Sequence, residues 1–319
     1  MNVFLTFDVE IWCNDWKSLD ERFPAAFERY VYGRSAAGDY ALPKTLEILN
    51  RHGLRGIFFV EPLFAARFGE RHLETVTRLI TDAGQEVQLH LHPEWTDEIR
   101  PAIFPDKPFK RQHLFQYSRD EQTALLRRGL DLLASVGCGD VTAFRAGSFA
   151  ANSDTLAAVA VCGLKVDSSL NMCYPISGSD LRGEGDFYLP RRRDGLRLLP
   201  ISVFRDGLGR LRHAQVGACS SAELTQAIED ADRLGHPCFT ILSHNFEMLR
   251  SRSSLPDRVV AGRFEALCRF LAANRERLPT AGLTDPPDWP DIGPTALAQA
   301  GRLATLGRYV GQAARRIAV

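Results

Sequence analysis

The sequence lacks the features that mark several large classes of protein. Its seven cysteines are odd in number and scattered, with no C-x-x-C pair, so neither a disulfide framework nor a thiolate zinc site is indicated. Lys+Arg and Asp+Glu total 39 each, and this zero net charge argues against a globally basic nucleic-acid-binding protein. We therefore expect no nucleic-acid partner. No apolar run approaches the length of a membrane span.

A secretory signal is also missing. The opening stretch "MNVFLTFDVE" begins a β-strand at once, without a basic region, an apolar core and a small-residue cleavage site. We therefore expect a cytoplasmic protein. The 319 residues suffice for one large α/β domain or two smaller ones, and 45% hydrophobic with 24% charged residues is an ordinary composition for a soluble protein.

What the chain does have is a repeating order of helix, glycine and short β-rich run. Examples are "TLEILNRHGLRGIFFVEP", "TRLITDAGQEVQLHLHP" and "IEDADRLGHPCFTILSHN". Each glycine stands where a helix C-cap requires a positive φ, and Ser118 with Glu121, like Ser220 with Glu223, forms a capping-box pattern. Helices that alternate with apolar strands predict parallel βαβ units, with at least six such strands. A barrel and an open doubly wound sheet both satisfy this pattern.

Residues with chemical capacity stand at the ends of the expected strands. In parallel α/β folds, active sites gather at the carboxyl ends of the strands. The residues at the six strand ends are Asp8 and Glu10, Glu61, His90 and His92, Arg145, Asp167, and His244.

Three segments interrupt the rhythm, and the C-terminal region differs from the rest. Residues 11–40 and 93–117 are long insertions that are either functional loops or surface decoration, and 171–217 includes a hairpin around Asp194–Gly195. We expect a barrel domain over 1–280, followed over 281–319 by a Pro-rich linker and a basic C-terminal helix. That helix either packs on the barrel or a partner, which we favour, or makes peripheral contact with an anionic membrane surface.

The strand-end residues suit a metal-dependent hydrolase. In a regular strand, residues two apart share a face, so His90 pairs with His92 and Asp8 with Glu10. Two carboxylates and two imidazoles can bind zinc, and also cobalt, nickel or manganese. Other interpretations remain for single residues: Asp8 as a helix cap, Arg145 with Asp167 as a structural ion pair, and His244 as a satisfied interior histidine.

The ordered set of motifs resembles the polysaccharide deacetylases of carbohydrate esterase family four. That family's T-F-D-D-G matches Thr6-Phe7-Asp8-Val9-Glu10, and its H-S/T-x-x-H matches the segment from His90 to Glu94. Its R-x-P-Y corresponds to Arg145-Ala146-Gly147-Ser148, its aspartate after a strand to Asp167, and its L-x-H to Leu242-Ser243-His244. The order and spacing agree from residue 3 to roughly 275. The resemblance implies a distorted, incomplete (β/α)7-type barrel.

The resemblance also implies a role for each matching residue. Asp8 corresponds to the catalytic base, with Arg145 paired to it, and His244 to the general acid, oriented by Asp167. Glu10 and His90 correspond to metal ligands, with Glu10 fitting a D-x-E variant because Val9 cannot bind a metal. The third ligand is Glu94 by strict spacing or His92 by the strand-face argument, and we choose His92. A backbone N–H near Ser148 corresponds to an oxyanion donor.

The resulting hypothesis is a hydrolase that depends on zinc, or on another of these divalent metals, and removes an acetyl group from an N-acetylated sugar or glycan. A cytoplasmic location favours a sugar nucleotide or a lipid-linked saccharide as the substrate. Trp12, Trp16 and Trp95 either stack on sugar rings or form part of the core. Two alternatives stay open: a related C–N hydrolase that acts on a small amide or ureide, and a non-catalytic glycan-binding protein on the same scaffold.

Overall fold

The computed structural model describes residues 1–106, 109–174, 178–181, 188–287, 289 and 295–317. The chain divides into two compact units, each assembled from separate stretches of sequence. Unit 1 comprises Met1–Gly56, Ser202–Ala281 and Thr295–Val319, and unit 2 comprises Ile57–Ile201 and Gly282–Pro294. The chain that follows Ala281 is therefore shared between the two units.

Unit 1 is built on two long parallel strands. Strand β1 (Asn2–Val9) pairs with β12 (Cys238–His244), so residues 236 positions apart, Asp8 and His244, face each other in register. Phe7 of β1 packs edge-on against Phe264 at a ring-centroid distance of 5.7 Å. The other strands of the unit are β2 (Arg34–Ser35), β3 (Gly38–Asp39), β10 (Val203–Arg205), β11 (Leu211–His213) and β13 (Ala298–Gln299).

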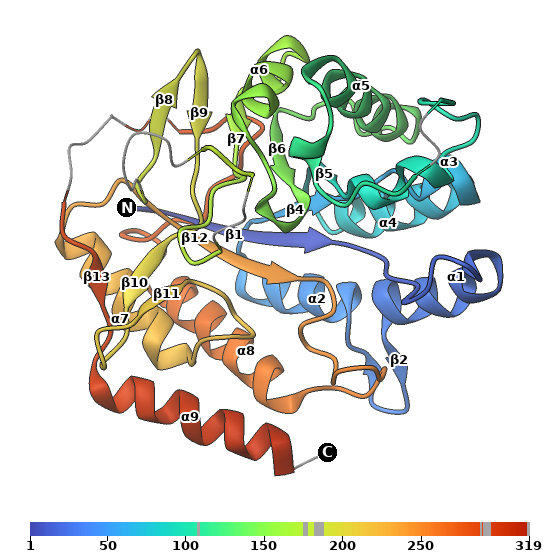
Figure 1. Ribbon diagram of the computed structural model, residues 1–319. Helices are drawn as coiled ribbons and strands as arrows, with labels where there is room; N and C mark the ends of the chain where they lie inside the picture. Colours follow the sequence, from blue (N-terminus) through green and yellow to red (C-terminus); the bar gives the residue numbers. More distant parts are fainter. Residues whose placement is uncertain (107–108, 175–177, 182–187, 288, 290–294, 318–319) are drawn as a thin grey trace. The chain divides into compact units, whose positions relative to one another are not determined.

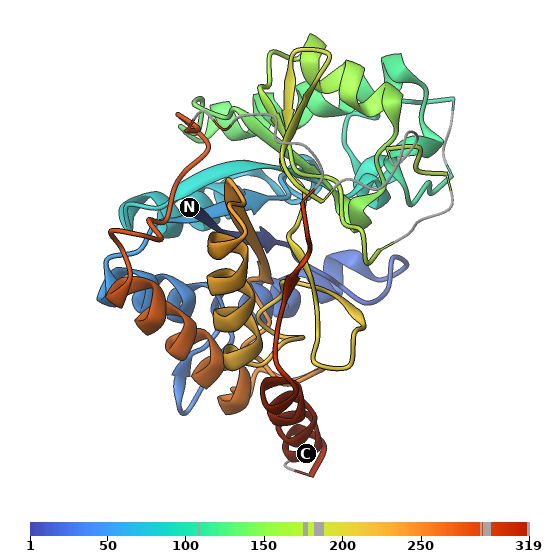
Figure 2. The same cartoon turned by 90° about the vertical axis from the view of Figure 1, so that its left-hand side faces the viewer.

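Helices of unit 1 pack in a row of neighbours. Helix α2 contacts α8, α8 contacts α7, and α7 contacts α9, as Figures 1 and 2 show. Amphipathic spacing buries one face of each helix, for example Leu46 and Leu49 of α2. The helices are α1 (Leu19–Phe27), the π-helix η1 (Glu28–Tyr32), α2 (Leu42–His52), α7 (Ser221–Arg233), α8 (Arg258–Ala273) and α9 (Arg302–Ile317).

Unit 2 contains a sheet whose first strands are parallel. Its neighbouring pairs are β4–β5, β5–β6, β6–β7 and β7–β9, all parallel, and the edge pair β8–β9 is antiparallel. The strands are β4 (Gly56–Val60), β5 (Glu86–Leu91), β6 (Ala143–Ala146), β7 (Val166–Asp167), β8 (Arg191–Arg193) and β9 (Leu196–Leu198). The helices are α3 (Ala65–Phe68), α4 (Glu70–Asp82), η2 (Pro93–Glu98), η3 (Leu114–Gln116), α5 (Arg119–Ser135), η4 (Gly147–Phe149) and α6 (Ser153–Val161).

Local sequence signals produce the local structure that they predict. Both capping boxes form, at the starts of α5 and α7. Gly53 ends α2 with a φ of 60°, which glycine adopts without steric cost. The β8–β9 hairpin turns through Asp194 and Gly195, whose φ angles of 51° and 82° match a type I′ turn.

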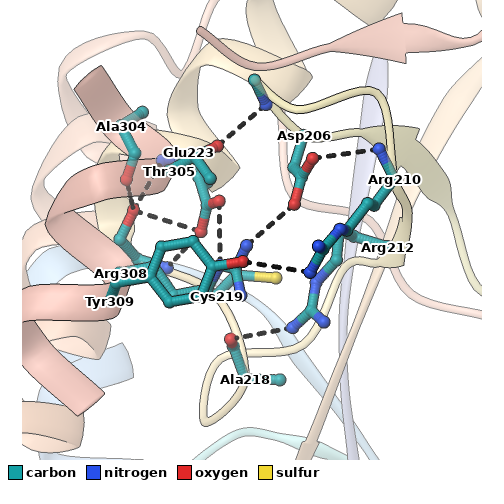
Figure 3. Close-up of polar contacts among 12 residues, drawn as sticks. Asp206, Arg210, Arg212, Ala218, Cys219, Glu223, Ala304, Thr305, Arg308 and Tyr309 are labelled. Atoms are coloured by element: carbon teal, nitrogen blue, oxygen red, sulfur yellow. Dashed lines mark hydrogen bonds and ion pairs between the residues drawn. The ribbon is translucent and has the colours of Figure 1, made fainter. Parts of the chain in front are cut away.

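Helix α9 is anchored to unit 1 by a buried charge cluster (Figure 3). The guanidinium of Arg308 donates to Glu223 at 3.0 Å and to Asp206 at 2.8 Å, and all three side chains are nearly inaccessible to solvent. Ser220 also donates to the Ala304 carbonyl, and the Gly207 amide donates to the Thr305 hydroxyl. The expected C-terminal helix is therefore confirmed from Arg302 onward, and it packs on its own unit.

In the part of the chain that the structure describes, no helix has both the length and the apolar content of a transmembrane span.

Candidate functional site

Unit 1 brings three of the predicted residues together at the ends of its parallel strands. One ligand atom each from Asp8, Glu10 and His244 lies within 4.8 Å of the others. Asp8 and His244 are register partners on β1 and β12, and Glu10 follows β1. Asp8 and Glu10 are buried, with 3% and 7% of their surface exposed. Two carboxylates and one imidazole therefore share a small, poorly solvated volume.

Asn245 fixes the backbone around this cluster. Its amide N–H donates to the Asp8 carbonyl at 3.1 Å, and its side chain both accepts from the Glu10 amide and donates to the Glu10 carbonyl. The Glu10 carboxylate accepts a 2.7 Å hydrogen bond from the indole N–H of Trp12. Trp12 therefore helps to orient a predicted metal ligand, a role that the sequence did not indicate.

His244 has a carboxylate partner within its own unit, and this partner is Glu247. The His244 Nδ1 lies 2.9 Å from a Glu247 oxygen. Glu247 is itself held by donors from the Gly217 amide, Gln215 and Ser243. Burial lowers the pKa of His244, but the hydrogen bond to Glu247 and the charges of Glu10, Glu247 and Asp8 raise it to about 9. His244 is consequently protonated at neutral pH, as a general acid requires.

The two histidines of the third strand lie together in unit 2. His90 and His92 offer ring nitrogens within 4.8 Å of each other, and their rings meet edge-on at 4.9 Å. His90 Nδ1 lies 2.7 Å from the Arg145 carbonyl, which can only accept, so Nδ1 carries the proton and Nε2 keeps a lone pair. His92 Nδ1 likewise faces the Glu94 carboxylate at 3.3 Å. This is the arrangement of metal-binding histidines, with Glu94 as the orienting partner of His92.

Gly147 explains one departure from the usual third motif. A Cβ atom at this position would lie 2.7 Å from both His92 Nδ1 and the Leu91 carbonyl oxygen, which is closer than any real contact. His92 therefore occupies the space that a larger residue would take. The next residues, Ser148 and Phe149, both have a φ of 55°, an unusual backbone conformation for non-glycine residues.

Arg145 and Asp167 are both fully buried in unit 2. The guanidinium of Arg145 donates to the Ser168 carbonyl and hydroxyl, and it lies 4.2 Å above the ring of Phe59. Asp167 accepts from the amide and hydroxyl of Ser169 at 2.9 and 2.8 Å. Burial raises the pKa of Asp167 to about 6, although Ser169 and Arg145 oppose the rise. The predicted roles of Arg145 toward Asp8 and of Asp167 toward His244 stay predictions.

Glu61 adds a further buried carboxyl after β4. It accepts from the amides of Leu63 and Phe64, and burial raises its pKa to about 8. Both of its carboxyl oxygens are therefore held by backbone amides of unit 2.

Two cavities lie beside His244 and Trp12 in unit 1. The first, of about 570 Å³, is lined by His244, Glu247 and several arginines. The second, of about 380 Å³, is lined by Trp12, Trp16, Tyr30 and Phe246, and the two cavities share Tyr30 and Phe246. Trp95, in contrast, is 2% exposed and packs on Phe64 and Phe68, which makes it a core residue.

The donors at these strand ends fit a divalent metal. In unit 2, His90 and His92 each present Nδ1 to an acceptor, as metal-binding histidines do, and in unit 1 the carboxylates of Glu10 and Asp8 lie together. Sequence reasoning missed Glu247, although a carboxylate three residues beyond a strand-end histidine was a readable signal.

Comparison with solved structures identifies the fold. The chain is 22% identical to a Mycobacterium smegmatis protein assigned as a polysaccharide deacetylase, with a TM-score of 0.52 over 90% of this chain and 94% of that one. This likeness confirms the expected distorted, incomplete (β/α) barrel of the polysaccharide deacetylases and, at the level of the fold, the resemblance seen in the motifs.

Two further structures are similar at lower TM-scores. A family 4 carbohydrate esterase from Streptomyces lividans, in complex with acetate, is 15% identical over 88% of this chain and 92% of that chain, with a TM-score of 0.44. A family 4 pseudoenzyme from Bacillus anthracis is 17% identical over 89% of this chain and 65% of that chain, with a TM-score of 0.43. No protein-family model matches the sequence, and no curated protein sequence matches it.

Proposed function

We propose that the protein is a metal-dependent hydrolase that removes the acetyl group from an N-acetylated sugar or glycan. The observation that carries the proposal is the cluster of Asp8, Glu10 and His244, in which a protonated imidazole stands beside two carboxylates. A base and an acid at one site are what amide hydrolysis requires. The fold of the Mycobacterium structure supports the same reaction class.

We assign the metal to His90, His92 and Glu10, with zinc as the first candidate and cobalt, nickel or manganese as alternatives. Two imidazoles with one carboxylate form a known set for catalytic zinc. When bound, such a cation lowers the pKa of a water molecule and polarises a carbonyl oxygen. Glu94 stays outside the ligand set because it contacts His92 at Nδ1, the nitrogen opposite the metal side.

The residues around this site divide the proton transfers between them. Asp8 accepts a proton from water as the water oxygen attacks the acetyl carbonyl carbon. His244 donates its proton to the sugar nitrogen as the C–N bond breaks, and acetate and the free amine leave. Glu247 is a positioning residue that holds His244 protonated. In this proposal Arg145 keeps Asp8 ionised, Asp167 supports His244 and an N–H near Ser148 binds the oxyanion.

The test is acetate release from N-acetylated sugars by protein supplied with zinc or cobalt. Asp8→Asn and His244→Ala are each expected to lower kcat by about 10²-fold or more, because each removes one proton-transfer group. The exposed substitution Arg269→Gln, on α8 of unit 1, is the control and is expected to leave kcat unchanged. Activity that survives both substitutions would overturn the mechanism.

Two alternatives use the same scaffold. A related C–N hydrolase would cleave small amides or ureides in preference to acetylated sugars, so profiling both substrate classes separates the two activities. A non-catalytic glycan-binding protein would bind sugars without acetate release at any metal concentration. The protonated His244 favours the enzyme, because a binding site gains little from a proton donor held beside two carboxylates.

We further propose that the substrate is a sugar nucleotide or a lipid-linked saccharide and that α9 contacts an anionic membrane surface. Three apolar residues on one face of α9 are exposed: Leu303 by 84%, Leu306 by 57% and Val310 by 63%. Arg302 at the start of α9 and Arg205 and Arg210 on the β10–β11 hairpin are exposed and form no ion pair within the described chain. Exposed apolar residues bordered by unpaired arginines suit anionic lipid. The cytoplasmic location stays a prediction.

Co-sedimentation with vesicles tests this contact. Vesicles that contain phosphatidylglycerol are expected to bind the protein, and pure phosphatidylcholine vesicles to bind it weakly. The double variant Leu303→Asp/Leu306→Asp is expected to lose binding, whereas Leu255→Asp, at an exposed leucine outside α9, keeps it. Equal binding by both variants would refute the contact. Loss of a dimer in the α9 variant alone would assign the face to a second copy of the chain.

A further inference from the structure

The larger cavity of unit 1, which we name the arginine pocket, is lined by an unusual number of cationic side chains. Arg29, Arg250, Arg252 and Arg315 line it together with His244 and Glu247. These arginines come from separated parts of the sequence: η1, the segment after β12, and α9. Among the described residues that line the pocket, Glu247 is the only carboxylate.

The one carboxylate among the described lining residues does not balance the charges of the four arginines of the pocket. Glu247 is already occupied, because it contacts His244 and accepts from the Gly217 amide, Gln215 and Ser243. Arg315 is paired with Asp257 at 2.6 Å, so its charge is neutralised by its own partner. An excess of positive charge therefore remains among the arginines that line the pocket.

Two of the arginines supply that excess. Within the described residues, neither Arg29 nor Arg252 forms an ion pair with a carboxylate. Arg29 lies 5.1 Å from the centroid of the Tyr30 ring, and its Nε is buried without a hydrogen-bond acceptor. Arg252 is exposed and sits in a turn with a φ of 56°. A buried N–H without an acceptor is costly, so a ligand oxygen at Arg29 would relieve that cost.

The volume of the pocket indicates more than a single inorganic ion. About 570 Å³ lies within the range of small-molecule binding sites, and guanidinium groups match carboxylate and phosphate oxygens in a planar fork. The adjoining cavity, with Trp12 and Trp16, supplies aromatic faces for a sugar ring. Tyr30 and Phe246 line both cavities, so one ligand can extend from the aromatic cavity into the arginine pocket.

We propose that the arginine pocket binds an anionic group, a phosphate or a uronate carboxylate, carried by the N-acetylated substrate. The proposal rests on the proposed deacetylase function and narrows its substrate class to acidic glycans or phosphorylated sugars. His244 lines the same pocket, so the anionic group binds close to the proton donor. Arg29 and Arg252 act in specificity: they select the charged substrate over a neutral sugar.

Steady-state kinetics with three probes test the selection. These are N-acetylglucosamine 1-phosphate, a disaccharide of N-acetylglucosamine and glucuronic acid, and neutral N-acetylglucosamine. The wild type is expected to have a kcat/KM at least tenfold higher for one of the two anionic probes than for the neutral sugar. The anionic probe with the higher kcat/KM identifies the group that the pocket binds. Arg29→Gln/Arg252→Gln is expected to lower kcat/KM about tenfold for that probe and less than twofold for the neutral sugar. Arg269→Gln is expected to change neither value.

Calorimetric binding to the metal-free protein separates this proposal from the deacetylase function. If no probe loses acetate, saturable binding of an anionic probe that weakens about tenfold in the double variant still supports the pocket. Arg252→Gln alone, at an exposed position, keeps the test valid if the Arg29 substitution impairs folding. Equal binding of charged and neutral probes, or binding unchanged in Arg252→Gln and in a folded double variant, would overturn the proposal.

Discussion

At the scale of single residues, the His244–Glu247 pair gives the site its acid. The folded protein raises the pKa of His244 from 6.5 to about 9, so folding takes up a proton in this range. The corresponding stabilisation is fully present below pH 6.5 and is lost as the pH rises through about 9. Activity that depends on the protonated imidazole is expected to decline as the pH rises through about 9.

Replacement of Glu247 tests this account. Glu247→Gln removes one negative charge and the charge-assisted hydrogen bond, so the pKa of His244 is expected to fall by about one unit or more. NMR titration of the metal-free protein measures the shift directly. The basic limb of the pH profile of kcat/KM is expected to move down by the same amount. An unchanged pKa would show that Glu247 does not set the charge of His244.

Gly147 provides a second prediction at the residue scale. Gly147→Ala places a methyl group 2.7 Å from His92 Nδ1, so the imidazole must shift. Zinc affinity, measured by competition with a chelator, is expected to fall about 10- to 100-fold, because changes that disturb the orientation of a metal ligand have effects of this size. Gly139→Ala is the matched control, because a Cβ there meets nothing within 4 Å. Equal zinc affinities in the two variants would contradict the close contact.

At the scale of elements, α9 shows how a basic helix becomes part of a folded unit. Its sequence contains no acidic residue, and from the sequence we favour packing over peripheral contact with a membrane. Arg308, however, enters a buried site with Asp206 and Glu223, two residues that lie far away in the sequence. Because such partners are brought together only by the fold, sequence periodicity predicts the helix and cannot predict which of its arginines is buried.

Arg308→Met tests the importance of this anchor. The substitution leaves two carboxylates buried without their cation and is expected to lower the free energy of unfolding by about 3 kcal/mol. Arg302→Met, at an exposed position of the same helix, is expected to change it by less than about 0.5 kcal/mol. Urea denaturation measures both values. A loss of similar size in the two variants would refute the anchoring role of Arg308.

At the scale of the whole molecule, the sequence predicts the architecture better than the site. Helix–glycine–strand repeats, capping boxes and the Asp194–Gly195 hairpin follow from local chemistry, and the structure confirms them. Glu247, the indole bond from Trp12 to Glu10 and the crowding at Gly147 depend on tertiary contacts. The fold brings these partners together, and of the three only Glu247 left a readable signal in the sequence. The division into two units also could not be inferred from the sequence, because each unit is built from separate stretches of the chain.

We propose that Glu10, His90 and His92 bind one divalent cation. Anomalous diffraction from crystals grown with cobalt, collected on both sides of the absorption edge, tests it most directly. We expect one strong peak about 2.0–2.2 Å from the Nε2 atoms of His90 and His92 and from a Glu10 carboxylate oxygen. The absence of a peak at His90 and His92, or a peak bound by Glu94 in place of His92, would contradict it.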